Sequence, residues 1–438
     1  MRRLTTFALL FLALSLAACR RSTPETVTLT YLRLGWSQPD ELPTAEPLNQ
    51  QFTRETRIQL KPLPVPENTL DQLDLTRKLL RRANSGPDVM GLDLIWTGVL
   101  AKDLLGLRSF LAPEIALLKP QLMPSYTVDG QVVALPYTVQ VGVLEYRSDL
   151  LREYGYDHPP KTWDELETMA ARIQAGERAK GNKNFWGYVW QGAAAEALTC
   201  NALEWQAAEG GGRVIENDRT ISVNNPAAIR SWQRAQKWIG WISPPSVLEF
   251  HEVDSMNSFD AGSTAFNRIW GATTISPNEP YGPLHWRGSL PEGKTGYASI
   301  PGGPGGRAGT LGGSGLAISR RSTHQQEAIQ LVRFLIRAQV RFEEKNAAKQ
   351  PGQPEVYDRP SIAQPLARTQ PTGQQTSGTV ARPSSVSGET YEDVTKAYIA
   401  AVHSVLTGHI PAPQAAADLQ AQLVKITGYG TGPPKPGN

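Results

Sequence analysis

The stretch Pro87-Asp88-Val89-Met90-Gly91-Leu92 is a short apolar run that follows a proline, and it is typical of a buried strand. Two further strands are expected before it, around residues 27–31 and 58–60, where hydrophobic and polar residues alternate. Hydrophobic residues at helical spacing fill the intervals, at residues 48–54 and 70–82. The order strand, helix, strand, helix, strand predicts a parallel sheet covered by helices.

A second α/β unit is expected after Pro136. Thr162-Trp163-Asp164-Glu165 is a capping box that opens a helix, and hydrophobic spacing predicts another helix over residues 227–242. Two more helices are expected near residues 391–406 and 413–426. A chain of 438 residues with this many periodic segments is long enough for two or three hydrophobic cores.

The composition excludes several classes of protein. Hydrophobic residues make up 40% of the chain, which excludes global disorder. The formal net charge is only +3, whereas a general nucleic-acid binder needs a dense basic surface, so no nucleic-acid partner is expected. Two cysteines cannot build a disulfide scaffold. The 11 tryptophans are the unusual feature and require an explanation.

The first residues have the pattern of a secretory signal. Arg2 and Arg3 precede an apolar run over residues 7–18, and small residues precede Cys19. The sequence Leu16-Ala17-Ala18-Cys19 resembles a lipobox, where bacterial lipoproteins are acylated on cysteine. Residues 1–18 are therefore predicted to be a lipoprotein signal peptide, Cys19 the lipidated residue and 19–25 a tether, which gives an extracytoplasmic, membrane-anchored protein. An ordinary signal peptide with an incidental cysteine is the alternative.

Most catalytic and cofactor motifs are absent from the sequence. The six histidines never fall at metal-ligand spacing, so no metal site is expected. The chain has no Gly-x-x-x-x-Gly-Lys-Ser/Thr loop for phosphate. Residues 312–316 miss the Gly-x-Ser-x-Gly nucleophile elbow by one glycine. No catalytic residue and no cofactor is therefore predicted.

Paired carboxylates for glycoside cleavage are the open alternative, because their separation is decided only in the folded chain. The candidates have no local context that favours acid–base chemistry over hydrogen bonding; they are Asp93, Glu145, Glu196 and Glu204. An exported glycoside hydrolase is thus the alternative function from another class.

Aromatic residues that stand beside neutral or acidic polar residues are the chemistry that remains. A sugar packs its C–H faces on aromatic rings and needs polar side chains as partners for its hydroxyls. Core packing is the competing explanation for each tryptophan, above all for Trp232, Trp238 and Trp241 on one expected helix. The mixed clusters are Asp93 to Trp96, Tyr137-Thr138, Trp190-Gln191, Glu204-Trp205 and Arg268-Ile269-Trp270.

Several of these segments are similar to one known family. The segments at residues 136–147, 154–156 and 159–163 resemble the centre of family 1 extracellular solute-binding proteins of ABC sugar importers. The segment from Trp186 to Trp205, with Glu196 inside it, resembles the trehalose/maltose-binding branch. The likeness extends from about Val27 to Ile426, almost the whole chain after the signal segment.

The resemblance implies an α/β, two-lobed periplasmic-binding-protein fold of type II, in which two discontinuous domains are joined by a hinge. We expect an N-lobe of residues 26–138 and 264–318 and a C-lobe of residues 139–263 and 319–427. The tail of residues 428–438 is predicted to be disordered from its composition.

The resemblance also implies where a sugar is held between the lobes. It assigns Asp93 as a hydroxyl acceptor, Tyr137 as an aromatic wall and Trp270 as a stacking platform. Gly313 is expected to bring its backbone close to the ligand. Arg382 matches a family arginine that reaches the sugar from the C-terminal part, with a solvated loop arginine as the alternative.

The sequence departs from the family pattern at three positions of this site. Gln140 replaces a carboxylate and is expected to keep a hydroxyl contact, while Ala272 and Ser314 replace aromatic residues. One of the tryptophans Trp36, Trp96 or Trp190 is predicted to fill the gap at the ligand site. Glu196 is a further expected ligand-binding residue.

These observations predict a non-enzymatic, monomeric receptor for a di- or oligosaccharide, anchored to a membrane by its N-terminal lipid. Ligand is expected to close the lobes, and the closed form is expected to dock on the permease subunits of an ABC importer. A structural surface lipoprotein with a decayed ligand site is a third reading, beside the hydrolase.

Overall fold

The computed structural model describes most of the chain, in the ranges 26–32, 48–65, 69–82, 86–118, 120–273, 294–348 and 378–435. The signal peptide, Cys19, the whole tether and Trp36 lie outside these residues, so their predictions stay predictions. Within the described ranges, no helix combines the length and hydrophobicity that crossing a bilayer requires.

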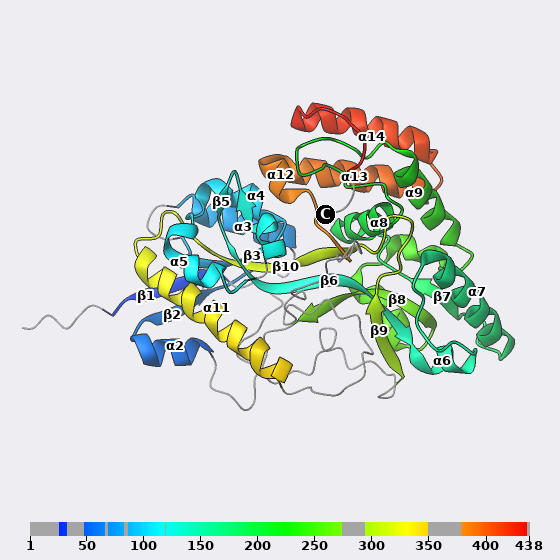
Figure 1. The fold of residues 1–438 in the computed structure, drawn as a ribbon, viewed down its shortest axis with the longest axis horizontal. Helices are drawn as coiled ribbons and strands as arrows, with labels where there is room; N and C mark the ends of the chain where they lie inside the picture. Colours follow the sequence, from blue (N-terminus) through cyan, green and yellow to red (C-terminus); the bar gives the residue numbers. More distant parts are fainter. Residues whose placement is uncertain are drawn as a thin grey trace, which may run out of the picture.

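The described residues form a nine-stranded sheet in the order β2-β1-β3-β10-β6-β8-β7, with β11 beside β10 and β9 beside β6 (Figure 1). Strands β1, β2 and β3 pair in parallel, as the sequence predicts, while β10 and β6 run antiparallel to their neighbours in the middle of the sheet. The strands are β1 (Thr28–Leu32), β2 (Gln59–Leu63), β3 (Val89–Asp93), β4 (Thr127–Val128), β5 (Gln131–Val132), β6 (Leu135–Arg147), β7 (Trp186–Val189), β8 (Thr264–Thr273), β9 (Thr295–Ser299), β10 (Gly309–Ile318) and β11 (Thr379–Val380).

Helices cover this sheet on both sides, in two groups that lie at opposite ends of β6 (Figure 1). In chain order they are α2 (Leu48–Thr56), α3 (Thr69–Leu80), α4 (Trp96–Leu100), η1 (Ala101–Asp103), α5 (Arg108–Ile115), η2 (Pro120–Tyr126), α6 (Ser148–Glu153), α7 (Trp163–Ala179), α8 (Glu196–Ala208), α9 (Pro226–Trp238), η3 (Pro245–Glu249), α10 (Glu252–Asp260), α11 (Gln325–Ala348), α12 (Ser384–Ser387), η4 (Gly388–Thr390), α13 (Tyr391–Leu406) and α14 (Ala412–Thr427). The predicted cap of α7 is present, because the Thr162 side chain accepts a hydrogen bond from the Glu165 amide at 3.2 Å.

Three strands pass from one lobe to the other. The first half of β6 pairs with β10, and its second half pairs with β8 and β9. Strand β8 starts beside β7 in the C-lobe and ends opposite Val139 in the first half of β6. Strand β10 starts against α8 of the C-lobe and ends between β3 and β6 of the N-lobe. The hinge therefore consists of continuous, hydrogen-bonded sheet.

The cores correct the predicted lobe boundaries. Val332 and Ile336 of α11 pack with Leu29 and Phe52, so this helix belongs to the N-lobe although it was assigned to the C-lobe. Residues 264–308 were assigned to the N-lobe, but Phe266 and other buried residues of this range lie in the C-lobe core. The amphipathic pattern shows that a helix face is buried, but it does not show which core buries it.

Most buried tryptophans lie together in the C-lobe core. Trp163 and Trp238 are 5.3 Å apart between ring centroids, and Trp205 contacts Trp238 edge-on at 5.6 Å. Trp232 packs edge-on against Tyr398 of α13 at 5.9 Å. Aromatic edges prefer such contacts with ring faces, which add to the hydrophobic free energy. The core role expected for Trp232 and Trp238 is confirmed. The core role expected for Trp241 is wrong: α9 ends at Trp238, the chain turns at Gly240 with φ +80°, and Trp241 is 46% exposed.

The tail was predicted to be disordered, but the structure describes it as far as Lys435. Its backbone pairs with Ile221, whose amide donates to the Gly430 carbonyl at 2.9 Å and whose carbonyl accepts from Gly432 at 3.1 Å. Tyr429 donates to the Val386 carbonyl at 2.7 Å, and Lys435 pairs with Asp218. These backbone bonds, which composition does not reveal, order the segment.

Candidate functional site

Arg382 links carboxylates from both lobes. It follows β11, and its Nη1 donates to Glu196 Oε1 of α8 at 3.0 Å. Its Nη2 lies 3.8 Å from Asp93 Oδ1 at the end of β3. The Arg382 side chain is only 5% exposed, whereas Asp93 and Glu196 keep 30% and 32% of theirs. One buried guanidinium thus lies between an N-lobe and a C-lobe carboxylate, which brings together three of the predicted site residues. We call Arg382, Asp93 and Glu196 the Arg382 group.

Further hydrogen bonds hold Glu196 in place at the start of α8. Tyr391 Oη donates to Oε1, and Thr395 Oγ1 donates to Oε2 at 2.7 Å. Both partners lie on α13, so Glu196 connects α8, α13 and Arg382. Sequence reasoning missed Tyr391 and Thr395, because both lie almost 200 residues from Glu196 and no local pattern links the two segments. The sequence Thr390-Tyr391-Glu392 does place an aromatic residue beside polar ones, and that signal could have marked Tyr391.

Burial and neighbouring charges have opposite effects on the pKa values of Asp93 and Arg382. Desolvation raises the pKa of Asp93, and the Arg382 charge and the Ile95 amide oppose the shift without cancelling it. Burial alone would lower the pKa of Arg382, but the surrounding negative groups, Glu196 and Asp93 among them, raise it well above its ordinary value. The arginine therefore remains charged between the two carboxylates.

The hinge strands β6, β8 and β10 lie beside the Arg382 group and form the floor of the site. Thr138 and Ser314 lie opposite each other on β6 and β10, with their hydroxyl oxygens 2.7 Å apart. Gln140 is partly exposed and lies between Gly312 of β10 and Ala272 of β8 in the sheet register. The three departures from the family pattern therefore lie close together in the register of these strands. Gln140 keeps an amide in place of a carboxylate, and Ser314 offers a hydroxyl in place of a ring.

Trp270 is half-buried on β8, next to this floor. The Arg268 guanidinium carbon lies 4.2 Å from the centre of its ring. A Cβ atom on Gly312 would come within 2.8 Å of the same ring, so only glycine leaves room for the indole there. The ring is therefore held in a fixed position with part of its surface accessible, as a stacking platform requires.

Gly313 and Tyr137 lie at the N-lobe side of the floor. Gly313 has φ +108°, and a Cβ atom there would come within 2.1 Å of the Thr138 carbonyl oxygen, so the position requires glycine. Its own carbonyl accepts from the Leu94 amide at 3.0 Å. Tyr137 packs against the N-lobe core, and burial raises its pKa to about 12.

Two tryptophans predicted to face the ligand are core residues instead. Trp96 is 3% exposed and packs in the N-lobe core with residues of β3. Trp190 is 0% exposed, contacts Trp205 edge-on at 4.9 Å and donates to Ser243 at 3.2 Å. Neither indole can reach a ligand in this conformation, so both assignments are corrected.

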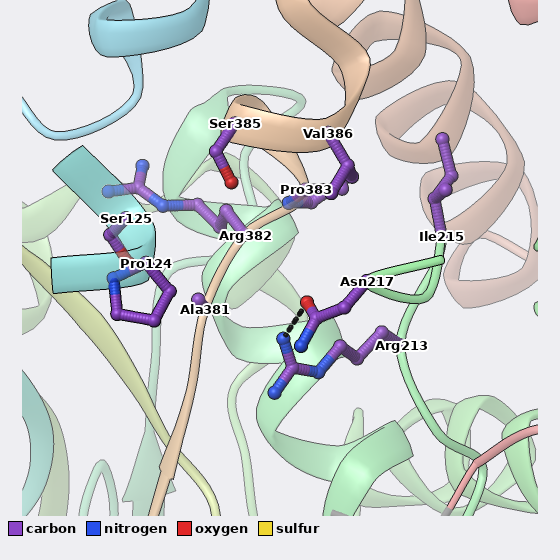
Figure 2. A pocket seen from close by; sticks show the side chains of 10 residues that line it. All are labelled: Pro124, Ser125, Arg213, Ile215, Asn217, Ala381, Arg382, Pro383, Ser385 and Val386. Carbon is purple, nitrogen blue, oxygen red and sulfur yellow. Dashed lines mark hydrogen bonds between the residues drawn. The ribbon is translucent and has the colours of Figure 1, made fainter. Parts of the chain in front are cut away.

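A small pocket opens between the lobes beside Arg382 (Figure 2). Figure 2 shows Arg382 extending toward Pro124 and Ser125 of η2, while Arg213 and Asn217 of the C-lobe lie on the other side. Its volume is about 20 Å³, room for about one water molecule. Because a sugar needs a few hundred Å³, a ligand can occupy this space only if the lobes move apart.

A family model described as "Bacterial extracellular solute-binding protein" matches residues 35–341. The chain belongs to this family of bacterial extracellular solute-binding proteins. A "Probable ABC transporter-binding protein" of Deinococcus radiodurans is 37% identical to this solute-binding protein over 385 residues, which cover 86% of this chain and 89% of the relative.

Solved structures share the fold of this solute-binding protein. The maltose-bound MalE3 of T. maritima has a TM-score of 0.70 at 29% identity and covers 91% of this chain and 100% of its own. A solute-binding protein of Thermotoga lettingae, bound with α-D-tagatose, has a TM-score of 0.70 at 22% identity, covering 92% and 100%. The likeness confirms the predicted two-lobed α/β fold.

The carboxylates considered for glycoside cleavage are all engaged in this solute-binding protein. Glu204 is fully buried and pairs with Arg268, while Glu196 accepts from Arg382, Tyr391 and Thr395. A general acid must reach the substrate oxygen, and Glu204 is buried too deeply to do so in this conformation. Within the described residues, no group of three or more His, Cys, Asp or Glu side chains could hold a metal ion.

Glu145 differs from the other carboxylates because burial raises its pKa to about 7. It accepts from Asn267 Nδ2 at 3.0 Å and from Tyr297 Oη at 3.1 Å, and these bonds only partly oppose the shift. Between its ordinary value of 4.5 and about 7, the folded protein therefore holds more protons than the unfolded chain. The stability contribution of Glu145 falls as pH rises through this window and stays low above it.

We expect Glu145→Gln to raise the free energy of unfolding at pH 8 by on the order of 2 kcal/mol, with the gain shrinking toward pH 5. The amide cannot ionise, and Asn267 can turn its oxygen, which has no hydrogen-bond partner among the described atoms, toward it. Urea unfolding at the two pH values measures the gain. Glu153→Gln, on a side chain that is 51% exposed, is the control without such a trend, and an equal gain at both pH values contradicts the prediction.

Proposed function

We propose that this protein is the receptor of an ABC sugar importer and captures a neutral di- or oligosaccharide between its two lobes. The observation that carries the proposal is Arg382, which lies between Asp93 of the N-lobe and Glu196 of the C-lobe. A ligand that hydrogen-bonds to this group contacts both lobes at once. The maltose in the MalE3 structure supports a sugar of this size.

The chemistry of the floor supports a neutral polyol. Thr138, Ser314 and Gln140 offer hydroxyl and amide groups that both donate and accept, as sugar hydroxyls require. Trp270 supplies an aromatic face for the C–H side of a sugar ring. Asp93 and Glu196 compensate the charge of Arg382, so the group does not demand an anionic ligand.

Ligand-driven closure is the mechanism we propose. Beyond Arg382 and its two carboxylates, the ion pairs between the lobes include Arg77–Glu392 at 2.8 Å, Lys102–Glu389 at 2.9 Å and Arg219–Asp129 at 3.1 Å. Ion pairs on the surface contribute little to stability, so a ligand that bridges both lobes shifts the equilibrium toward the closed form. The closed form then docks on the permease subunits.

Anchoring by a lipid on Cys19 is part of the same proposal. The lipobox-like sequence before Cys19 supports it, and a single polypeptide then remains at the membrane while its two lobes stay in water. Mass spectrometry of the protein from bacterial membranes tests the anchor. An acylated Cys19 at the mature N-terminus is expected, and cleavage elsewhere without a lipid would contradict it.

Titration calorimetry with maltose, trehalose, sucrose and maltotriose tests the receptor function. We expect at least one sugar to bind in the micromolar range, about −8 kcal/mol. Small-angle X-ray scattering should show a smaller radius of gyration with that sugar than without it. If no sugar binds and no compaction occurs, the decayed-site alternative is favoured; turnover of a chromogenic glycoside would favour the hydrolase.

Gly98→Ala is expected to hinder closure. A Cβ atom on Gly98 would lie 2.3 Å from the Ser384 carbonyl oxygen and 3.1 Å from the Gly388 Cα, across the contact between α4 and the C-terminal segment. Sugar affinity should fall about tenfold, while the midpoint of thermal unfolding stays level or rises, because alanine favours a helix by roughly 1 kcal/mol.

Scattering with saturating sugar measures the effect of Gly98→Ala on closure. Gly106→Ala is the matched control in the same lobe, since among the described residues its Cβ would meet only the Gln131 side chain, at 3.6 Å. Equal compaction and equal affinity in both variants would show that the lobes do not close through this contact.

A further inference from the structure

The Glu204 carboxylate is a fully buried charge at the point where the three hinge strands meet. It lies on α8, and its Oε1 accepts from Arg268 Nη2 at 2.6 Å and from the Thr310 amide at 2.9 Å. Its Oε2 accepts from Arg268 Nε at 3.2 Å. Both side chains of the pair are 0% exposed. One carboxylate therefore binds β8 through a side chain and β10 through its backbone.

The third hinge strand is shaped around the same carboxylate. A Cβ atom on Gly142 of β6 would lie 1.9 Å from Glu204 Oε1 and 2.6 Å from Arg268 Nη2. Only glycine can occupy this position while the ion pair is in place. Thr310 strengthens the connection, because its hydroxyl also donates to the Cys200 carbonyl of α8 at 2.8 Å.

The same ion pair determines where the Arg268 guanidinium lies, and that guanidinium contacts the Trp270 ring. Burial alone would lower the pKa of Arg268, but the Glu204 charge and hydrogen bonds raise it, so the arginine stays protonated. The cation is 4.2 Å from the ring centroid, within the range of a cation–π contact. Gly312 limits the ring on another side. The orientation of Trp270 thus depends on an arginine that Glu204 holds.

A purely structural role does not account for this pair. Removing two charges from water costs several kcal/mol, and well-packed hydrophobic residues often stabilise a core as well or better. The pair nevertheless lies where the hinge strands, the helix α8 and the Trp270 ring converge. Its position, rather than its net contribution to stability, requires an explanation.

We propose that Glu204 is a positioning residue for ligand binding. Through Arg268 it fixes the face that Trp270 presents, and through Thr310 it fixes α8 relative to the strand that enters the N-lobe. Stacking of a sugar on Trp270 is thereby coupled to the angle of the hinge. The inference rests on the proposed function, since it assigns a role in binding a sugar between the lobes.

Comparison of Glu204→Gln with Glu114→Gln tests the proposal. Glu114 is also 0% exposed, and its Oε1 accepts from Arg337 and lies 3.5 Å from Arg333, in the N-lobe and away from the hinge. Glu204→Gln should unfold at a lower temperature than the wild type, because it leaves the fully buried Arg268 without its carboxylate. Glu114→Gln should lose less, since its partners Arg333 and Arg337 are 38% and 48% exposed. Only Glu204→Gln should weaken sugar binding about tenfold and reduce the compaction seen by scattering.

A fluorescence measurement separates this inference from the proposed function. Subtracting the emission of Trp270→Phe in each background isolates the Trp270 signal, which responds to the adjacent cation. We expect Glu204→Gln to shift this signal without any sugar, and Glu114→Gln to leave it unchanged. Arg268→Lys keeps the charge but loses the paired geometry, so it should shift the signal too if Glu204→Gln does not fold.

Equal affinity, compaction and Trp270 emission in the Glu204→Gln and Glu114→Gln proteins would overturn the positioning role. If the wild type binds none of the sugars, the proposed function fails, and the Trp270 emission of the variants then decides the inference alone.

Discussion

Replacing Trp270 with alanine is expected to weaken sugar binding by roughly thirtyfold, about 2 kcal/mol. The indole is half-buried and is held by Arg268 and Gly312, with part of its surface exposed. Truncation removes both the stacking contact and the apolar surface that a sugar ring covers. Tryptophan is among the residues that dominate binding energies when they lie in a desolvated site.

Titration calorimetry with the best sugar of the panel measures this loss. Trp241→Ala is the matched control, because Trp241 is 46% exposed on the turn after α9, away from the Arg382 group. Its affinity should equal that of the wild type. If Trp270→Ala binds as tightly as Trp241→Ala, the platform role is wrong and the ligand stacks elsewhere.

Replacing Trp190 with alanine is expected to act on stability instead of affinity. Its indole is 0% exposed, meets Trp205 edge-on and donates to Ser243. Loss of a buried tryptophan costs about 3–5 kcal/mol, through lost transfer free energy and the cavity that remains. The C-lobe should therefore unfold at a markedly lower urea concentration.

Urea unfolding followed by circular dichroism measures the loss, and Trp190→Phe is the control that keeps most of the volume and should lose much less. Sugar affinity of the folded Trp190→Ala protein should change by no more than about twofold. A large loss of sugar affinity with unchanged stability would contradict the core role and show that Trp190 contacts the ligand.

The fold was largely predictable from local signals and from the order of motifs. Alternating hydrophobic residues predicted β1, the order of strands and helices predicted its parallel pairing, and the Thr162 cap marked the start of α7. The lobe boundaries were not predictable. Helix α11 has an amphipathic pattern that either core could bury, and only its contacts with Leu29 and Phe52 assign it to the N-lobe.

The site was predictable only in part, and the incompleteness of the prediction has a physical cause. Asp93, Glu196 and Arg382 were named singly and do come together, but their pairing depends on side chains from distant segments. Two tryptophans with similar polar neighbours in the sequence differ in burial: Trp190 is in the core, whereas Trp270 is half-buried at the hinge. The exposure of a tryptophan depends on neighbours that are distant in the sequence, which a local pattern does not predict.

The passage of three strands between the lobes has a consequence for how the chain folds. Strand β3 pairs with β10 through Asp93 and Ser314, so the N-lobe sheet cannot close before most of the chain exists. The C-lobe core likewise cannot form completely until α13 and α14 are present, because it contains residues of both helices. No single cut yields an intact lobe, and contacts of such long sequence separation predict slow refolding. We therefore expect the two lobes, whose closure is proposed above, to fold as one cooperative unit.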